Sequence, residues 1–353
     1  MKAVVMTEIN HLEVVDVEIP RPGDDEVLLK IMAVGVCGSD IPRILKYGSH
    51  VLPIIPGHEF AGEVVEIGKK IKEWHVGDKA AAAPLIPCNE CEWCKKGIYS
   101  LCEKYQYYGS RNNGAFAQYL AVKADNLIKL SEDTPYDWGA TIDPAANALH
   151  AFFRAEAGAQ DTICVFGMGA IGLFAIQYAK AIGMKAIIAV DVNDEKLQTA
   201  KECGATCTIN SLREDITKRV QEVTGGKGVS VSFDMSGVPI AQAQAVLVAG
   251  KMGRVVFLGI SHASLSLPEE AVDNILRYQL SVIGSWNSFS NPFPGREWTE
   301  AAKLMAEKKL DPTILISHRL GLDDMPETFK KIEQKEIVFN KIMFYPNGIE
   351  LAS

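Results

Sequence analysis

The pattern of hydrophobic and polar positions divides the chain into two parts. Up to about residue 150, short β-type runs such as 27–36 and 62–67 are punctuated by Gly and Pro, without a long helical period. From residue 162 onward, apolar strand-type runs alternate with helical stretches such as 173–182 and 194–203. The strand-type runs lie at 162–166, 186–190, 207–209, 229–233 and 254–258. This order predicts an α/β protein, in which a β-rich, partly barrel-like part precedes a doubly wound parallel sheet.

A glycine-rich turn joins the first of these later strands to its helix. Its residues, in G-x-G-x-x-G spacing, are Gly167, Met168, Gly169, Ala170, Ile171 and Gly172. Gly167 permits a tight turn, Gly169 lets a pyrophosphate approach the backbone, and Gly172 lets the helix pack closely on the strand. The unpaired N–H groups at the start of the helix would then bind the pyrophosphate. The turn therefore predicts a dinucleotide site.

An acidic residue at the end of the next strand makes this interpretation more specific. Asp191 lies nineteen residues after the third glycine, where a carboxylate can accept hydrogen bonds from both ribose hydroxyls of NAD and repel the extra phosphate of NADP. The first basic residue after it is Lys196, so NAD is the predicted cofactor. Later strands end near 234–237 and near Leu258 and Ile260, which are predicted to line the nicotinamide side.

The uncharged stretch 162–179 has a second interpretation, as a membrane-spanning or buried core helix. Its three spaced glycines and its polar flanks argue against a membrane span. The first residues of the chain alternate like a strand that contains charges, unlike a signal peptide. These observations predict a cytoplasmic protein.

Composition limits the function further. The 353 residues are enough for two domains with a core each. The net charge of −8 argues against nucleic acid or an anionic membrane as the main partner. Eight cysteines in a cytoplasmic chain indicate metal binding or catalysis before disulfides.

Four of the cysteines stand close together, in C-x-x-C-x-x-C-x7-C spacing. They are Cys88, Cys91, Cys94 and Cys102. Four thiolates at this spacing suit a closed tetrahedral zinc site that leaves no position for substrate. An iron–sulfur cluster or disulfides are the alternatives. The later cysteines lack metal-binding spacing and are interpreted as core or surface thiols: Cys164, Cys203 and Cys207.

Cys37 and His58 form a separate pair of candidate ligands. Cys37 closes a strand-type run, and His58 follows twenty-one residues later, between Gly57 and Glu59. A lone cysteine or histidine is more often a core residue. Here both stand at predicted strand ends beside a glycine and a carboxylate, where a metal could be reached.

These motifs together resemble the zinc-dependent medium-chain alcohol and polyol dehydrogenases. The resemblance covers essentially the whole chain and rests on Cys37, the G-H-E-x-x-G-x5-G run 57–68, the Gly-Asp pair 77–78, the four-cysteine group and the glycine turn. It implies a GroES-like catalytic domain with a structural zinc lobe over 1–150, a Rossmann NAD-binding domain over 151–290, and a return to the catalytic domain over 291–353. It also implies a homodimer or homotetramer, for which the apolar strand near Val282 is a candidate interface.

Carried over to this sequence, the resemblance implies that Cys37 and His58 bind a catalytic zinc. The third ligand in polyol-type members is usually the Glu of a Glu-Pro dipeptide, and this chain has Asp143-Pro144 instead. Other members use Asp there, sometimes with the glutamate after the histidine, which makes Glu59 a further candidate ligand. The residues alone fit a second interpretation of Asp143 equally well, as a helix N-cap before Pro144.

The implied activity is the oxidation of an alcohol on a small molecule, with two zinc ions per chain and NAD as cofactors. One thiolate, one imidazole and one carboxylate leave an open position on zinc. Zinc at that position lowers the pKa of a bound hydroxyl, and the resulting alkoxide gives hydride to the nicotinamide. The hydroxyl of Ser39, two residues after Cys37, is the candidate group that would pass the released proton toward water. Ser39 also fits a second interpretation, as an ordinary serine in a turn.

The resemblance is greatest to members that oxidise a secondary alcohol of a sugar-alcohol phosphate to a ketose phosphate. It is carried by the segments 40–50, 108–111 and 285–298. A phosphorylated substrate needs cationic donors, and those on these segments are Arg43, Lys46, His50, Arg111 and Arg296. Each alone also fits a solvated surface charge, and the loop 287–298 also fits an interdomain hinge or a dimer contact.

Three other functions stay open. One is a dehydrogenase of an unphosphorylated polyol, secondary alcohol or diol. A zinc-free NADP-type quinone reductase shares the two-domain layout but would lack Cys37, His58 and the four-cysteine group. A noncatalytic dinucleotide-binding scaffold would keep the fold without turnover.

Overall fold

The computed structural model describes residues 1–351 of the 353-residue chain and divides it into two compact units. Unit 1 comprises Met1–Asp143, Ser288–Lys308 and the chain from Ile316 onward, and unit 2 comprises Pro144–Asn287 and Lys309–Leu315. The predicted boundaries lie near 150 and 290. The short segment Lys309–Leu315 belongs to unit 2 because Gln177 on α5 (Ala170–Ala181) bonds both the backbone N–H and the backbone carbonyl of Asp311.

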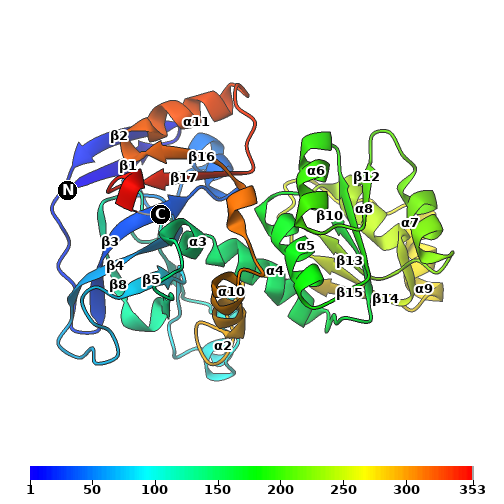
Figure 1. Cartoon of the computed structure of the whole chain (residues 1–353), viewed down its shortest axis with the longest axis horizontal. Coiled ribbons are helices and arrows are strands. Elements are labelled where there is room, and N and C mark those ends of the chain that lie inside the picture. The colour runs from blue at the N-terminus through cyan, green and yellow to red at the C-terminus, as the bar shows by residue number, and fades with distance from the viewer. Residues whose placement is uncertain (352–353) are drawn as a thin grey trace. The chain divides into compact units, whose positions relative to one another are not determined.

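Unit 1 is the β-rich part. Its described strands are β1 Lys2–Glu8, β2 His11–Asp16, β3 Glu26–Gly35, β4 Glu59–Ile67, β5 Lys79–Ala82, β6 Leu85–Ile86, β7 Gln106–Tyr107, β8 Tyr119–Lys123, β9 Leu127–Lys129, β16 Ile316–Gly321 and β17 Lys341–Tyr345. Over the described residues, the main sheet has the order β16-β17-β3-β4-β5-β9, with β8 also paired to β3. Figure 1 shows β17, from the end of the chain, near β3 from its start.

The centre of this sheet explains why its strands read as continuous apolar runs. β3 pairs antiparallel with β4 and β8, and its carboxyl end also meets β17, so it has no free edge. A strand with neighbours on both edges is buried along most of its length. Its sequence therefore does not alternate between buried apolar and exposed polar residues. Phe60, Phe116 and Phe344 pack into the same core, fully buried.

Short helices border the sheets of unit 1. They are α1 Asp40–Pro42, α2 Glu92–Lys95, α3 Tyr136–Ala140, α10 Arg296–Ala306 and α11 Met325–Glu333. The helix α4, Ile142–Arg154, begins in unit 1 and continues in unit 2. α10 begins directly after Gly295, which caps the helix at a positive φ of 134°.

Unit 2 is a doubly wound parallel sheet, which confirms the predicted α/β class. Its strands are β10 Thr162–Phe166, β11 Ala186–Asp191, β12 Cys207–Asn210, β13 Val229–Asp234, β14 Ala249–Phe257 and β15 Ser281–Gly284, in the order β12-β11-β10-β13-β14-β15. Besides α5, its helices are α6 Asp194–Cys203, α7 Ile216–Thr224, α8 Pro239–Leu247 and α9 Glu269–Arg277. β14 begins five residues before the predicted 254, because Ala249 already pairs with Val229 across a register shift that the apolar pattern does not reveal.

The core of unit 2 is built from the alternating apolar strands. Cys164, Phe166, Ile188 and Val190 form one buried cluster with residues of β14 and α8. Phe152 on α4 stacks on Phe233 of β13 with ring centroids 4.6 Å apart, an arrangement worth about 0.5–1.5 kcal/mol beyond its buried area.

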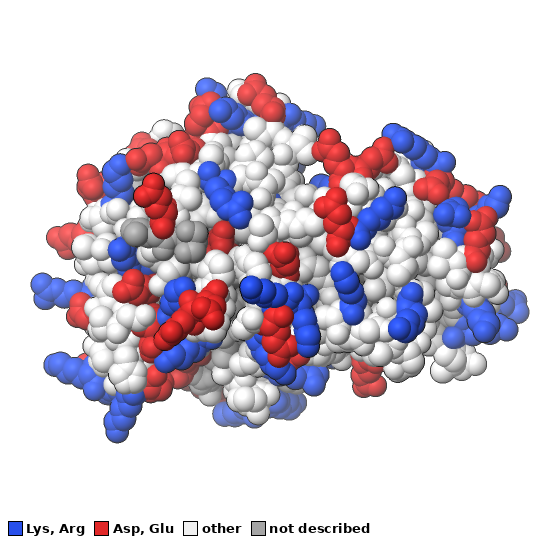
Figure 2. Space-filling view, in the orientation of Figure 1, with Lys and Arg blue, Asp and Glu red and all other residues white. Residues whose placement is uncertain are grey.

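The uncharged stretch 162–179 forms a strand, a turn and most of a helix, so the interpretation of it as one membrane-spanning helix is wrong. Among residues 1–351, the structure has no helix that is both long and apolar enough to cross a membrane. Figure 2 shows basic and acidic side chains interspersed over the face in view.

Candidate active site

Strand pairing brings the candidate metal ligands of unit 1 together. Cys37 follows the end of β3, and Glu59 begins β4 directly opposite Gly35 of β3. One ligand atom from each of Cys37, His58 and Glu59 lies within 4.8 Å of the others. Gly35 leaves room for this group, since a Cβ there would lie 2.7 Å from Glu59 Oε2.

Asp40 is a carboxylate that contacts Nδ1 of the His58 imidazole. It is fully buried, its Oδ2 accepts a hydrogen bond from the Cys37 backbone N–H, and its Oδ1 lies 3.2 Å from His58 Nδ1. A carboxylate on one imidazole nitrogen leaves the other nitrogen for a metal. Burial lowers the pKa of His58, but the charges of Asp40 and Cys37 outweigh it and leave that pKa well above its usual value.

Glu59 has a buried basic partner. Lys341, the first residue of β17, donates to Glu59 Oε2 over 2.5 Å and to the Val36 carbonyl over 2.9 Å. Both side chains are almost fully buried. Burial alone would lower the pKa of Lys341, but the charge of Glu59 outweighs it and leaves that pKa above its usual value. Glu59 is therefore shared between Lys341 and the position that a metal would occupy.

Asp143 adjoins this group without being part of the cluster within 4.8 Å. It lies in the first turn of α4, which begins at Ile142, so it is not the residue that caps the helix. Burial is the main reason that its pKa rises to about 7; the charge of Glu59 also raises it, and those of His58 and Lys341 lower it. A bound cation would stabilise the ionised carboxylate.

Ser39 lies against the thiol of Cys37. Its hydroxyl donates to Cys37 Sγ over 3.3 Å. This contact places the hydroxyl beside the metal group. Its role in passing a proton stays a prediction.

The four-cysteine group lies in the segment around α2. One Sγ from each of Cys88, Cys91, Cys94 and Cys102 falls within 4.8 Å of the others, and the described structure contains them as free thiols, not disulfides. The backbone N–H of Cys91 donates to Cys88 Sγ, and the backbone N–H of Cys88 donates to Cys102 Sγ. Hydrogen bonds from the backbone N–H groups of Cys94 and Glu103 lower the pKa of Cys91 to about 6. These thiolates fit a tetrahedral zinc ion.

Three of the five predicted phosphate-binding residues lie near one another. Burial lowers the pKa of His50, and so do the positive charges of Arg111 and Arg43. Ser49 donates to the Ser110 carbonyl over 2.8 Å, which joins the two segments that carry His50 and Arg111. Arg43 Nη1 lies 3.4 Å from Asp40 Oδ1, so this cationic cluster of Arg43, His50 and Arg111 adjoins the metal group.

The other two basic candidates have different surroundings. Lys46 is exposed and its ammonium lies 5.1 Å from the ring of Tyr47. Arg296 is exposed at the first position of α10. Neither residue contributes to the lowered pKa of His50.

In unit 2, the glycine turn forms a cradle at the carboxyl end of β10. A Cβ on Gly172 would lie 1.9 Å from the Gly167 carbonyl oxygen, and one on Gly167 would lie 2.9 Å from Ser236 Cβ. In contrast, a Cβ on Gly169 meets nothing within 4 Å. The helix α5 begins at Ala170, followed by Ile171. A pyrophosphate in the open space over Gly169 would therefore meet the first N–H groups of this helix.

Asp191, the last residue of β11, accepts hydrogen bonds at the same edge of the sheet of unit 2. Its Oδ2 accepts from the Met168 backbone N–H over 2.7 Å, and its Oδ1 accepts from the Asn193 N–H over 3.0 Å. Each carboxylate oxygen can accept a second hydrogen bond, as ribose hydroxyls would require. Lys196 lies in the first turn of α6.

Leu258 and Ile260 follow β14 at this edge of unit 2. The backbone N–H of Leu258 donates to the Asp234 carbonyl, and a Cβ on Gly237 would lie 2.3 Å from the Ile260 carbonyl oxygen. Asp234 is fully buried and its carboxylate accepts from Ser236, Gly237 and Gln242. The ends of β10, β13 and β14 therefore lie together, as the doubly wound pattern predicts.

Sequence analysis did not assign a role to Asp40, Tyr107 or Lys341. The position of Asp40, three residues after Cys37, was an available signal. Tyr107 on β7 lies edge-on to the His58 ring at 5.7 Å, and burial, followed by the charge of Asp143, raises its pKa well above the usual value. Lys341 lies 282 residues from Glu59 in the chain, so no local pattern could pair them.

Two family models match the chain. The alcohol dehydrogenase GroES-like domain matches residues 23–132, and the zinc-binding dehydrogenase model matches residues 170–307. Galactitol 1-phosphate 5-dehydrogenase of Escherichia coli K12 is 38% identical over 98% of this chain and 100% of its own length. Sorbitol dehydrogenase of Bacillus subtilis is 31% identical over 98% of each chain.

Solved structures agree with these relatives. The crystal structure of galactitol-1-phosphate dehydrogenase from Escherichia coli superposes with a TM-score of 0.94 at 38% identity, covering 98% of this chain and 100% of the other. A zinc-binding dehydrogenase from Sinorhizobium meliloti 1021, bound to NADP, has a TM-score of 0.89 at 29% identity, covering 98% of this chain and 99% of the other.

Proposed function

The chain belongs to the zinc-dependent medium-chain alcohol and polyol dehydrogenases, and we propose that it oxidises a secondary alcohol of a sugar-alcohol phosphate with NAD. The observation that carries the choice of substrate is the cationic cluster of Arg43, His50 and Arg111 beside the metal group. The product would be a ketose phosphate. The similarity to galactitol 1-phosphate 5-dehydrogenase supports the same substrate class.

The donor set at the catalytic group fits zinc. Cys37 supplies a thiolate, His58 an imidazole, and Glu59 or Asp143 a carboxylate, which together leave one position open. A zinc ion there would lower the pKa of a substrate hydroxyl. Asp40 orients His58, and Lys341 holds Glu59 when it is not needed as a ligand. Ser39 would relay the proton, with its oxygen accepting the substrate hydroxyl proton while its own proton passes to water.

The cationic cluster would bind and orient the phosphate. Arg43 and Arg111 present planar guanidinium groups that can form paired hydrogen bonds to phosphate oxygens, and a ring N–H of His50 can donate one more. Arg111 also stacks over Tyr105, with its guanidinium carbon 4.7 Å from the ring centroid. A fixed anion-binding group of this kind would select the position of the carbon that is oxidised.

The dinucleotide would bind unit 2 at the glycine turn, and Asp191 would accept the ribose hydroxyls. A 2′-phosphate would bring negative charge next to that carboxylate, which favours NAD over NADP. The proposal predicts that NAD supports turnover far better than NADP with every active substrate. A reversed preference would contradict the role of Asp191.

The test is a matched panel of alcohols followed by reduction of NAD. We expect kcat/KM for galactitol 1-phosphate or glucitol 6-phosphate to exceed that of the free polyol by about a hundredfold, roughly 2.7 kcal/mol. Arg111→Ala should remove most of this advantage by raising KM for the phosphorylated substrate, whereas Lys46→Ala, the exposed matched control, should not. Equal activity toward free polyols would contradict the phosphate site.

The second candidate is a dehydrogenase of free polyols or diols, which the similarity to sorbitol dehydrogenase favours. The same panel separates the two, because sorbitol, xylitol or 2,3-butanediol would then react best and Arg111→Ala would have little effect. A noncatalytic scaffold would turn over none of these compounds.

A further inference from the structure

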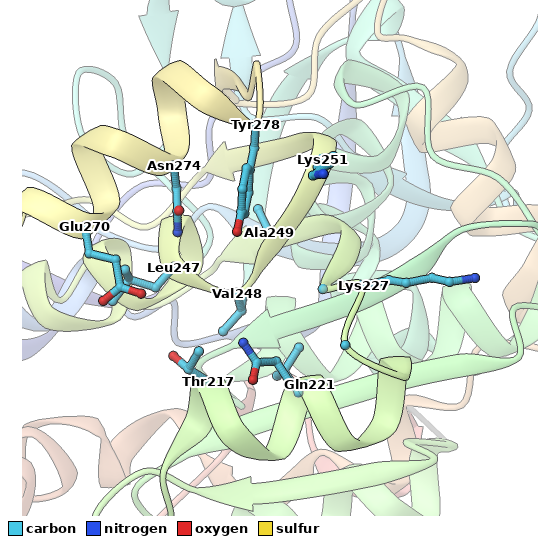
Figure 3. Close-up of a pocket in the computed structure, with 13 residues that line it drawn as sticks. Thr217, Gln221, Lys227, Leu247, Val248, Ala249, Lys251, Glu270, Asn274 and Tyr278 are labelled. Atoms are coloured by element: carbon cyan, nitrogen blue, oxygen red, sulfur yellow. The ribbon is translucent and has the colours of Figure 1, made fainter.

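Unit 2 has a cavity at the edge of its sheet opposite the glycine turn. It has a volume of about 440 Å³ and lies between α7 and α9, beside the end of α8 and the loop 226–228 (Figure 3). Val229 and Ala249, the first residues of β13 and β14, mark this edge as the amino end of the strands. The dinucleotide cradle is at their carboxyl ends, so the cavity is not part of it.

Two helices present polar residues to each other across the cavity. Glu270, Asn274 and Tyr278 recur every four residues along α9 and its end, which places them on one face. Thr217 and Gln221 are four residues apart on α7. In Figure 3, Asn274 and Tyr278 point toward Thr217 and Gln221. The space between these faces is therefore polar, and a polar ligand could take the place of water there.

The facing side chains have no partner within the described chain. Asn274 is only 9% exposed, yet no described residue accepts from or donates to its carboxamide. The same holds for the side chains of Thr217, Gln221 and Tyr278. The Asn274 carboxamide is not among the side-chain groups that are both sealed from solvent and unpartnered, so water can reach it in the cavity. A ligand in the cavity would replace that water as the hydrogen-bond partner of Asn274.

The chemistry of the lining defines the ligand. Carboxamides and hydroxyls both donate and accept, as sugar hydroxyls do, and Tyr278 offers an aromatic face and a phenol. Leu247, Val248 and Ala249 supply an apolar floor. The volume falls in the range typical of small-molecule sites.

Charge adds one further requirement. Lys227 and Lys251 line the cavity together with the single carboxylate of Glu270, so the site is net positive when both ammonium groups face it. In Figure 3 the Lys227 ammonium extends away from the cavity, so its flexible chain would have to turn inward. A lysine binds phosphate as a point charge from varied directions. The site therefore suits a hydroxylated ligand with one anionic group.

We propose that this cavity binds a sugar phosphate or polyol phosphate at a second site, separate from the catalytic group. The proposal does not depend on the substrate proposed above, since every residue that supports it lies in unit 2. Ligand bound between α7 and α9 would contact the segments that begin β13 and β14, whose other ends form the cofactor cradle.

Methyl NMR of the full chain, with zinc and NAD bound, tests the proposal. Val220, Leu247 and Val248 line the cavity and report occupancy of that place alone. We expect glucose 6-phosphate to shift these methyl signals saturably, with glucose and inorganic phosphate each binding at least about tenfold more weakly. No saturable shift with glucose 6-phosphate would overturn the proposal, as would equal shifts with inorganic phosphate alone.

Variants locate the contact. Asn274→Leu and the milder Tyr278→Phe should weaken the glucose 6-phosphate effect, about tenfold or more for Asn274→Leu. Gln160→Leu, an exposed carboxamide outside the cavity, should not. If Asn274→Leu fails to fold, Tyr278→Phe decides. If the shifts remain in both variants, or disappear in Arg111→Ala, glucose 6-phosphate binds at another place and the proposal is wrong. The assignment of the catalytic residues would not be affected by either result.

Discussion

At the scale of single residues, the buried pair of Glu59 and Lys341 gives the first prediction. Replacing Lys341 by Met leaves the Glu59 carboxylate buried without its cation, which should lower the free energy of unfolding by about 3–5 kcal/mol. The double variant Glu59→Gln with Lys341→Met should recover part of that loss, because no charge then remains uncompensated. Urea unfolding and thermal melting of the three proteins measure both effects.

The exposed Lys330→Met serves as the matched control and should leave stability within about 0.5 kcal/mol of the original. A Lys341→Met protein as stable as this control would contradict the ionised pair. It would mean that Glu59 is neutral or permanently held by the metal.

Asp143 gives the second prediction. Asp143→Ala should reduce the zinc content from two ions per chain to one, because Cys37, His58 and Glu59 would then have to hold the catalytic ion without the neighbouring carboxylate. Elemental analysis after dialysis measures the ratio, with the exposed Asp133→Ala as control. Retention of two ions would show that Glu59 suffices as the carboxylate ligand.

What the sequence reveals at this scale depends on how far apart the partners lie in the chain. Cys37, His58 and the four cysteines could be proposed because glycines and fixed spacings surround them. Lys341 could not, since it meets Glu59 only through the pairing of β17 with β3. The gathering of Arg43, His50 and Arg111 likewise depends on a contact between separate loops.

At the scale of elements, the four-cysteine segment 88–102 supports a neighbouring loop. Ser100 Oγ donates to the Phe289 carbonyl and accepts from the Phe289 N–H, and the rings of Tyr99 and Phe293 lie 5.2 Å apart. Phe289 in turn stacks on Trp298. The loop 288–298, which the sequence left open as a substrate segment, a hinge or a dimer contact, is therefore packed against the four-cysteine segment 88–102.

This contact gives the third prediction. Cys94→Ser should weaken zinc binding in the lobe and speed amide hydrogen exchange in both 88–102 and 288–298, because the loop loses its packing surface. Exchange in the strands of unit 2 should not change, and Cys207→Ser, a cysteine outside both metal groups, should affect neither segment. Faster exchange in 88–102 alone would show that the loop is held independently.

The strands β10 to β13 and the helices α5 and α6 were predicted to within a few residues, because each strand is a short apolar run bounded by glycine or a polar turn, whereas α7, α8 and α9 were not predicted. α6 matches its predicted range, since Asn193 caps one end and Gly204 the other. β14 was predicted too short because its first residues, Lys251 and Met252 among them, are exposed and carry no apolar pattern. The cavity between α7 and α9 was not predicted, since polar spacing on two helices does not show that they face each other.

At the scale of the whole molecule, β15 provides the last prediction. It is the edge strand of the six-stranded sheet of unit 2, over the described residues, and Val282 at its centre is 47% exposed. An edge strand with an exposed apolar residue pairs readily with a second copy, and two-fold pairing would extend the sheet across a dimer. Val282→Lys should therefore give a particle near the 38.5 kDa of one chain in sedimentation experiments, where the original protein gives at least twice that mass. Val272→Lys, at a similarly exposed position on α9, should leave the assembly intact. An original protein that sediments as a monomer, or a Val282→Lys protein that remains dimeric, would move the interface away from this edge.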